Sequence, residues 1–263
     1  MRVVRFIARG RAKYGLLAKN TMSGLRGNPF SHFQHLNSPF ILDGNIYTLD
    51  KVKLLSPCLP SKIICLGLNY RSHIEEMKLP VPTTPLIFLK PSTAVIGPND
   101  KIILPHGWER IDYEGELGVV IRKKAKDVPE EEAKEYVFGY TCFNDVSDRH
   151  AQAADGQWTR AKGYDTFAPL GPWIETEVNP DNLKLETYLN SELRQSASTS
   201  DLIFGIPKLI SFISSVMTLL PGDVIATGTP SGVGPMNPDD MIEVRIENIG
   251  TLKNFVVAQE YPA

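Results

Sequence analysis

The amino-acid sequence predicts an α+β, β-rich protein with a small N-terminal β-rich domain over residues 1–56 and a larger domain over residues 57–263. Three observations support this prediction. Short segments with alternating or β-branched apolar residues recur along the whole chain, whereas few stretches have helical spacing. The third observation is a proline-punctuated junction, Ser56-Pro57-Cys58-Leu59-Pro60, after which the character of the sequence changes.

Composition excludes several classes of protein. The chain is 42% hydrophobic and 22% charged, which is ordinary for a globular protein and unlike disordered or collagen-like chains. A net charge of -2 leaves no basic excess to neutralise phosphates, so no nucleic-acid partner is expected. No apolar stretch approaches the ~20 residues that cross a bilayer, and the first residues lack the pattern of a secretory signal, so no membrane partner is expected.

The cysteines indicate a reducing compartment. Cys58, Cys65 and Cys142 show no C-x-x-C spacing, and any disulfide would leave one of them over. Each is flanked by apolar residues, so we expect three buried thiols and a cytoplasmic protein.

The N-terminal segment carries few chemical signals. Strands are expected over 3–8, 13–18 and 47–49, separated by a loop that contains Asn37-Ser38-Pro39. His32 and His35 are three residues apart and could share a helical face, but without a carboxylate or cysteine partner nearby they do not predict a metal site.

A first chemical signal follows the strand expected over 62–67. Ser72 could cap a short helix there, with Glu75 completing a capping box. On that helix His73 and Glu76 share one side, so the carboxylate can orient the imidazole and raise its basicity. The alternative is a surface His beside a surface Glu. The prolines that follow would make a stiff connection suited to the hinge of a lid.

The acidic stretch 111–121 is the second chemical signal in the sequence. On a strand, Glu114 and Glu116 point the same way, and Gly115 between them would leave room for a ligand. Two adjacent carboxylates repel unless a proton or cation lies between them, although a solvated acidic edge is the alternative. A second strand, 137–143, delivers Asp145 at its carboxyl end. Three carboxylates from two strands suit Mg²⁺ or Mn²⁺.

The remaining elements complete the expected fold. Strands are expected over 86–90 and 101–105, and helices over 130–137 and 206–220. Residues 147–155 are compatible with a helix, and Trp158–Asp165 reads as a polar loop whose Lys162 could hold an anionic substrate. Further strands are expected over 167–174, in a hairpin at 185–196, over 224–227, and in a closing hairpin at 241–257.

The glycine-rich loop 228–234 is the last signal. It lacks the Lys-Ser/Thr of a P-loop and no helix follows it, so phosphate binding is not expected. Its backbone N–H groups, including that of Gly228, and the Thr229 hydroxyl suit a carboxylate instead.

Together these motifs resemble the fumarylacetoacetate hydrolase family. The resemblance rests, in the family's order over roughly 57–257, on Gly67-Leu68-Asn69-Tyr70, His73 and Glu76, Tyr113-Glu114-Gly115-Glu116-Leu117, Asn144-Asp145-Val146-Ser147, Lys162, Pro221-Gly222-Asp223 and Thr227 to Gly234. The N-terminal segment looks like the small extra domain of many prokaryotic members, such as 2-hydroxyhepta-2,4-diene-1,7-dioate isomerases and acylpyruvate hydrolases.

The resemblance implies a fold, a cofactor and an assembly. It implies a mixed β-roll or barrel, a homodimer, and one Mg²⁺ or Mn²⁺ ion per subunit held by Glu114, Glu116 and Asp145. The helix that carries His73 and Glu76 would belong to a lid that orders over the substrate. Asp112 has no counterpart in the motif and is left outside the ligand set.

The implied substrate is a small 2-oxo acid, bound near Asn69, Tyr70, Gln152, Gly228 and Thr229. Our first hypothesis is hydrolysis of a C–C bond in an acylpyruvate-type 2,4-dioxo acid through a metal-stabilised enolate. His73 would activate a water molecule, with Glu76 holding its tautomer. Lys162 and Thr229 would bind the substrate carboxylate and Gln152 the oxyanion.

Other reactions remain open. The runner-up is an isomerase or oxaloacetate-type decarboxylase of aromatic catabolism, which needs no attacking water, and a sugar-acid dehydratase ranks third. A metal-dependent binding protein without turnover would leave His73 and Glu76 idle. The sequence also departs from the family at Asp148-Arg149-His150, where many members have Ala-Arg-Asp, so His150 could touch the substrate.

Overall fold

The computed structural model describes residues 1–32 and 40–260 and is rich in strands. The predicted β-rich α+β class is confirmed. The loop with His35 and Asn37-Ser38-Pro39 lies outside the described residues. Within the described ranges, none of the helices is both long and apolar enough to span a membrane.

The largest sheet has twelve strands and joins the N-terminal segment to the rest of the chain. Strand β1 pairs with β14, with Arg2 opposite Glu175 and Val3 opposite Ile174. The sheet is an open path from β4 to β7 and does not close into a barrel. Its strands, in spatial order, are β4 (Leu42–Thr48), β3 (Thr21–Leu25), β2 (Arg11–Ala18), β1 (Arg2–Ala8), β14 (Ala168–Glu175), β12 (Val137–Asn144), β11 (Gly115–Ile121), β17 (Val224–Ala226), β6 (Ile63–Gly67) and β7 (Leu86–Lys90), with β5 (Lys53–Leu55) on β1 and β8 (Val95–Ile96) on β14.

Two smaller sheets complete the strand architecture. The five-stranded sheet contains β16 (Glu192–Ser198), β15 (Lys184–Leu189), β19 (Met241–Ile246), β20 (Gly250–Ala258) and β9 (Lys101–Leu104). The three-stranded sheet contains β13 (Ser147–Asp148), β10 (Ile111–Tyr113) and β18 (Gly234–Pro235). Both predicted hairpins of the five-stranded sheet are therefore present.

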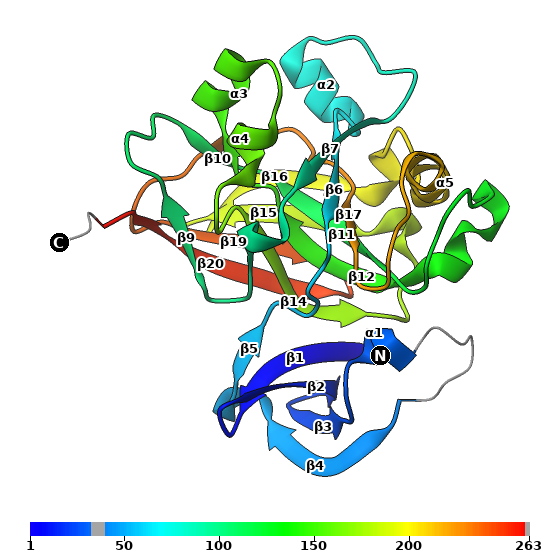
Figure 1. Ribbon diagram of the computed structural model, residues 1–263. Helices are drawn as coiled ribbons and strands as arrows, with labels where there is room; N and C mark the ends of the chain where they lie inside the picture. The colour runs from blue at the N-terminus through cyan, green and yellow to red at the C-terminus, as the bar shows by residue number, and fades with distance from the viewer. Residues whose placement is uncertain (33–39, 261–263) are drawn as a thin grey trace.

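The helices are short. They are α1 (Pro29–His32), α2 (Arg71–Met77), α3 (Arg149–Asp155), α4 (Thr159–Gly163) and α5 (Ile206–Val216), with 3₁₀ turns at Leu49–Lys51, Ser92–Ala94, Glu130–Tyr136, Pro180–Asn182 and Thr199–Asp201. Helix α2, together with α3 and α4, lies at the end of the molecule opposite the N-terminal strands (Figure 1).

Several local predictions differ from the structure. Residues 130–136 form 3₁₀ turns rather than an α-helix, and the loop expected at 158–165 contains α4. Helix α5 ends before Leu219 because that residue pairs with Ala125. Ser72 lies inside α2 and does not cap it, since the N-cap is Tyr70 without a side-chain bond.

The main core fills the space between the two large sheets. It contains Leu117 and Val119 of β11, Leu185 of β15 and Val244 of β19, and α5 closes it with the apolar face that its spacing predicts. All of these side chains are buried. This packing makes β11 and β12 rigid, and their ends carry the candidate site.

Candidate metal centre and cavity

Three buried carboxylates converge where β11 begins and β12 ends. Glu114, Glu116 and Asp145 each offer an oxygen, and these oxygens all lie within 4.8 Å of one another. Glu114 falls between β10 and β11, so the predicted continuous strand is broken there. Backbone pairing sets the alignment, because Asp145 N donates to Glu114 O at 2.8 Å and Gly115 pairs with Asn144.

The space beside Gly115 is filled by protein atoms, so a ligand cannot occupy it. A Cβ on Gly115 would lie 2.1 Å from Thr187 Oγ1 of β15, which is far inside van der Waals contact. Gly115 N also donates to Gln195 Oε1 at 3.0 Å. The glycine is therefore needed for close packing of the two sheets, and the prediction that a ligand approaches here is wrong.

Two lysines and one arginine surround the carboxylates. Lys162 Nζ donates to Glu114 Oε2 at 2.8 Å and to Asp145 Oδ2 at 2.7 Å, and Arg149 Nη2 donates to Glu114 Oε1 at 2.6 Å. Lys90 is completely buried and donates to Asp145 Oδ1 and to the carbonyl of Val146. The cluster is thus a network of alternating charges in a water-poor environment.

Burial and the neighbouring charges shift the pKa values of the side chains in this cluster in different directions. Burial and the neighbouring Asp145 and Glu114 charges raise the pKa of Glu116 well above its usual value. Burial alone would also raise the pKa of Glu114, but Lys162 and Arg149 outweigh that effect and hold it below its usual value. Burial lowers the pKa of Lys90, and its ion pair with Asp145 opposes that shift.

The donor set fits a hard divalent cation. Glu116 Oε2 accepts from Gly228 N at 2.8 Å, whereas Glu116 Oε1 is buried with no hydrogen-bond partner. An oxygen that is left without a donor in a cluster of carboxylates suits a cation that accepts oxygen ligands.

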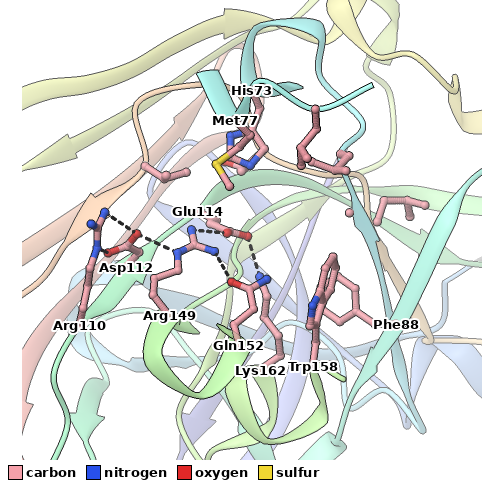
Figure 2. Close-up of a pocket in the computed structure, with 16 residues that line it drawn as sticks. His73, Met77, Phe88, Arg110, Asp112, Glu114, Arg149, Gln152, Trp158 and Lys162 are labelled. Atoms are coloured by element: carbon pink, nitrogen blue, oxygen red, sulfur yellow. Dashed lines mark hydrogen bonds and ion pairs between the residues drawn. The ribbon is translucent and has the colours of Figure 1, made fainter. Parts of the chain in front are cut away.

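A cavity of about 360 Å³ opens above this cluster. Figure 2 shows His73 and Met77 on one side of it, Glu114 with Arg149 and Lys162 at its base, and Phe88 with Trp158 along one wall. Gln152 and Thr229 also line it. The cavity therefore brings together five of the residues predicted from the sequence: His73, Glu114, Gln152, Lys162 and Thr229.

His73 and Glu76 form the predicted pair. His73 Nδ1 lies 3.1 Å from Glu76 Oε2, which leaves Nε2 outside this contact. Glu76 Oε1 accepts from Gly232 N at 3.0 Å, and Ser72 Oγ accepts from Ser231 N at 3.3 Å. Helix α2 is thus fastened to the glycine-rich loop, and that loop orients the carboxylate that orients His73.

Three residues predicted to contact the substrate do not line the cavity, and neither does His150, which the sequence left as a possible contact. Asn69 is buried, and its amide bonds to Thr227 O and to both N and O of Phe204. Tyr70 is also buried, and its hydroxyl has no hydrogen-bond partner. The N–H of Gly228 donates to Glu116. It is therefore not available to a substrate carboxylate, contrary to the prediction. The His150 side chain is 59% exposed and lies 3.2 Å from Glu109.

The sequence interpretation missed Lys90, Arg110 and Arg149. Lys90 ends the strand predicted over 86–90, and its position at the end of an apolar strand, like that of Asp145, is the signal that could have found it. Asp112 lines the cavity but remains outside the carboxylate cluster. Its Oδ2 accepts from Arg149 Nε at 2.8 Å. Arg149 lies in the Asp148-Arg149-His150 motif, but its carboxylate partners Asp112 and Glu114 are 37 and 35 residues away, so the local sequence did not indicate its role. Arg110 is only two residues from its partner Asp112, and nothing in the local sequence indicated that the pair lines a cavity.

Two family descriptions match the chain. "Fumarylacetoacetate (FAA) hydrolase C-terminal" matches residues 62–257, and "Rv2993c-like, N-terminal" matches residues 1–57. Among relatives, an uncharacterized protein of Archaeoglobus fulgidus is 56% identical, with 82% of this chain and 87% of the relative covered. An oxaloacetate tautomerase of Rattus norvegicus is 41% identical over 79% of this chain and 70% of its own length.

Solved structures share the whole architecture. A 5-carboxymethyl-2-hydroxymuconate delta-isomerase from Mycobacterium smegmatis superposes with a TM-score of 0.90 at 42% identity, covering 98% of this chain and 100% of the other. A maleylpyruvate hydrolase from Sphingobium sp., solved with manganese (II) ion and pyruvate, superposes with a TM-score of 0.83 at 32% identity, covering 99% and 100%.

Proposed function

Because the chain belongs to the fumarylacetoacetate hydrolase family, whose members are enzymes, we propose that it acts on a small 2-oxo acid with Mg²⁺ or Mn²⁺ as cofactor. The observation that carries the proposal is the convergence of Glu114, Glu116 and Asp145 beneath a cavity lined by His73. These three carboxylates would hold the cation. When bound, the cation supplies a Lewis acid that offsets negative charge developing on substrate oxygens.

Lys162 would hold the carboxylate of the substrate. It lines the cavity, and its ammonium touches two of the three carboxylates, so an anion bound there would lie next to the cation. The Thr229 hydroxyl donates to Gly115 O at 3.0 Å and accepts from Gln195 Nε2 at 2.8 Å. Thr229 therefore shapes the wall, and Lys162 carries most of the attraction in this proposal.

The reaction we favour is hydrolysis of a 2,4-dioxo acid of the acylpyruvate type. His73 takes a proton from water, and the resulting hydroxide attacks the C4 carbonyl. The C3–C4 bond then breaks, its electron pair moves to C3, and the products are a carboxylic acid and the enolate of pyruvate. Return of the proton from His73 to C3 gives pyruvate. Glu76 holds His73 in the tautomer that leaves Nε2 free.

Arg149 and Gln152 would stabilise the charge that appears during attack. Arg149 Nη1 donates to Gln152 Oε1 at 2.8 Å, which turns the Gln152 amide nitrogen away from the arginine. An amide N–H that faces a cavity is a suitable donor to an oxyanion. The Sphingobium hydrolase was solved in complex with manganese (II) ion and pyruvate, which supports a 2-oxo acid and a divalent cation as ligands of this chain.

A second candidate reaction is isomerisation or decarboxylation, as in aromatic catabolism. The Mycobacterium isomerase and the rat tautomerase, at 42% and 41% identity, support this candidate. These reactions need a proton shift or loss of CO₂ at the same enolate and no attacking water. The homodimer and the cytoplasmic location stay predictions.

The test separates the two reactions in one assay. We expect the wild-type protein with Mg²⁺ or Mn²⁺ to release pyruvate and acetate from 2,4-dioxopentanoate. A His73→Ala variant should lose about 100-fold or more of this hydrolysis, because a general base contributes about 10²–10⁴-fold. Its release of CO₂ from oxaloacetate should fall less. The products are measured by chromatography and by CO₂ detection.

The matched control is His150→Ala, whose side chain lies outside the cavity lining. It should hydrolyse 2,4-dioxopentanoate at the wild-type rate. Undiminished hydrolysis by His73→Ala would remove the water-activation step. A wild-type protein that isomerises or decarboxylates 2-oxo acids without hydrolysing any would establish the second candidate.

A further inference from the structure

We propose that Gln195 of β16 is a positioning residue for both halves of the site, although it does not line the cavity. One half is the pair of carboxylates Glu114 and Glu116, and the other is the His73–Glu76 pair. This inference rests on the proposed function, because it gives Gln195 a role in cation binding and in the placement of His73.

The amide of Gln195 is buried and holds two segments of the chain together. The residue is 1% exposed. Its Oε1 accepts from Gly115 N at 3.0 Å, and its Nε2 donates to Thr229 Oγ1 at 2.8 Å and to Pro230 O at 2.9 Å. These partners fix the orientation of the amide, since a backbone N–H only donates and a backbone carbonyl only accepts. Releasing one of them would leave a buried polar group unpaired.

The first segment joins the two carboxylates. Gly115 lies between Glu114 and Glu116, and its N–H donates to Gln195. Its carbonyl accepts from Thr229 Oγ1 at 3.0 Å, and that hydroxyl is the one that accepts from Gln195. Both polar backbone groups of Gly115 are therefore fixed directly or indirectly by one side chain. The spacing of the two carboxylates depends on this contact.

The second segment is the glycine-rich loop, which holds the helix with His73. Gln195 binds the carbonyl of Pro230, and two residues later Gly232 N donates to Glu76 Oε1 at 3.0 Å. The other oxygen of Glu76 lies 3.1 Å from His73 Nδ1. Displacing the loop would therefore move the carboxylate that orients His73.

An irregularity in the β15–β16 hairpin lies at this contact. The pairing shifts register between Thr187 and Tyr188, so Arg194 is the extra residue of a β-bulge. A Cβ on Gly232 would lie only 2.2 Å from Arg194 O, so the loop packs directly on the bulge. Bulges beside functional sites commonly redirect a neighbouring side chain. Here the neighbour is Gln195, which makes the hydrogen bonds to the loop.

Gln195→Met tests the proposal, because methionine has a similar shape and cannot replace these hydrogen bonds. We expect isothermal titration to show about 10-fold weaker Mg²⁺ binding, the lower end of the effect of residues that support metal ligands. With saturating Mg²⁺, kcat for 2,4-dioxopentanoate should still fall about 10-fold while KM changes by less than about threefold, since His73 is displaced and the cavity lining is kept. Hydrogen exchange of the metal-free protein, followed by mass spectrometry, should become faster in residues 228–234 and in α2.

Thr187→Val is the matched control. Thr187 lies directly opposite Gln195 in the hairpin and is completely buried, but its hydroxyl has no hydrogen-bond partner. This variant should keep the Mg²⁺ affinity, kcat and hydrogen exchange of the wild-type protein. Equal losses in Thr187→Val and Gln195→Met would assign the effect to packing of the hairpin and would overturn the proposal.

A second variant, Thr229→Val, covers the case in which Gln195→Met does not fold, as judged by circular dichroism. It removes the hydroxyl that connects Gln195 to Gly115 O. We expect about fivefold weaker Mg²⁺ binding, as for the loss of one neutral hydrogen bond, together with faster exchange in residues 228–234. Wild-type Mg²⁺ affinity in this variant, or in folded Gln195→Met, would overturn the proposal and leave the cation site intact.

The exchange measurement separates this proposal from the proposed function. A wild-type protein that binds neither Mg²⁺ nor Mn²⁺ would contradict the proposed function. In that case, faster exchange in Gln195→Met but not in Thr187→Val would still support Gln195 as the anchor of the loop. Unchanged exchange in Gln195→Met would reject that role whatever the protein binds.

Discussion

At the scale of single residues, Glu116 is a carboxylate whose negative charge is unfavourable in its buried surroundings. Its carboxylate is buried beside two others, and burial together with their charges raises its pKa. One oxygen has a backbone donor and the other has no partner. Removing a carboxylate from water without a partner is costly, so a fold that keeps it there needs a proton or a cation to offset the charge.

We therefore predict that Glu116→Gln weakens Mg²⁺ binding by about 100-fold or more, since even partners of metal ligands contribute about 10- to 100-fold. Isothermal titration measures the affinity directly. Glu177→Gln, at an exposed position, is the control and should bind Mg²⁺ like the wild-type protein. Unchanged affinity in Glu116→Gln would exclude Glu116 from the ligands.

At the scale of elements, the short helix α1 packs between the N-terminal strand β2 and strand β12 of the same large sheet. Phe30 of α1 is 5% exposed and packs against Phe138 of β12, with ring centroids 4.9 Å apart, and against Tyr14 of β2 at 6.2 Å. It shares one apolar cluster with Val3 of β1 and Ile174 of β14. A helix too short to be stable alone is thus held by its packing.

We expect Phe30→Ala to lower the free energy of unfolding by about 3 kcal/mol, in the usual range for a buried Phe. Urea unfolding followed by circular dichroism should show a single transition at lower urea concentration. Ile46→Ala, on the exposed face of β4, should change the free energy by no more than about 0.5 kcal/mol. A separate early transition in Phe30→Ala would show that the N-terminal strands unfold independently.

At the scale of the whole molecule, several cysteine and tyrosine side chains have raised pKa values because the core buries them. Burial raises the pKa of Cys142 to about 12, and it raises the pKa values of Cys58 and Cys65 as well. Tyr14 and Tyr140 likewise have pKa values of about 12 because they are buried. All three cysteines are free thiols, as predicted.

These shifts predict a loss of stability in alkali. Above pH 9, the ordinary pKa of a thiol, the unfolded chain releases protons that the folded chain keeps, so rising pH favours unfolding. Between pH 8 and 10.5 each buried thiol should lower the free energy of unfolding by about 2 kcal/mol. Urea titrations at the two pH values measure the change, and Cys142→Ala should show a smaller one. Equal stability at both pH values would contradict the buried thiols.

The local sequence determined much of the fold and part of the site. Most strands were predictable because apolar residues alternate or cluster between turn residues, and α5 because its apolar residues recur at helical spacing. The His73–Glu76 pair followed from their separation on one helix, and the carboxylate cluster from charged residues at the ends of apolar strands. These signals depend on neighbours in sequence.

Tertiary structure alone decided the rest. It assigned Gly115 to the contact with Thr187, placed Lys90 under Asp145, and connected Arg110 to Glu114 through Asp112 and Arg149. It also withdrew Asn69, Tyr70 and Gly228 from the cavity wall. The partners in these contacts can be far apart in sequence, and Gly115 and Thr187, for example, are 72 residues apart. Packing and charge act through space, so residue type and local spacing could not reveal which side chains would meet.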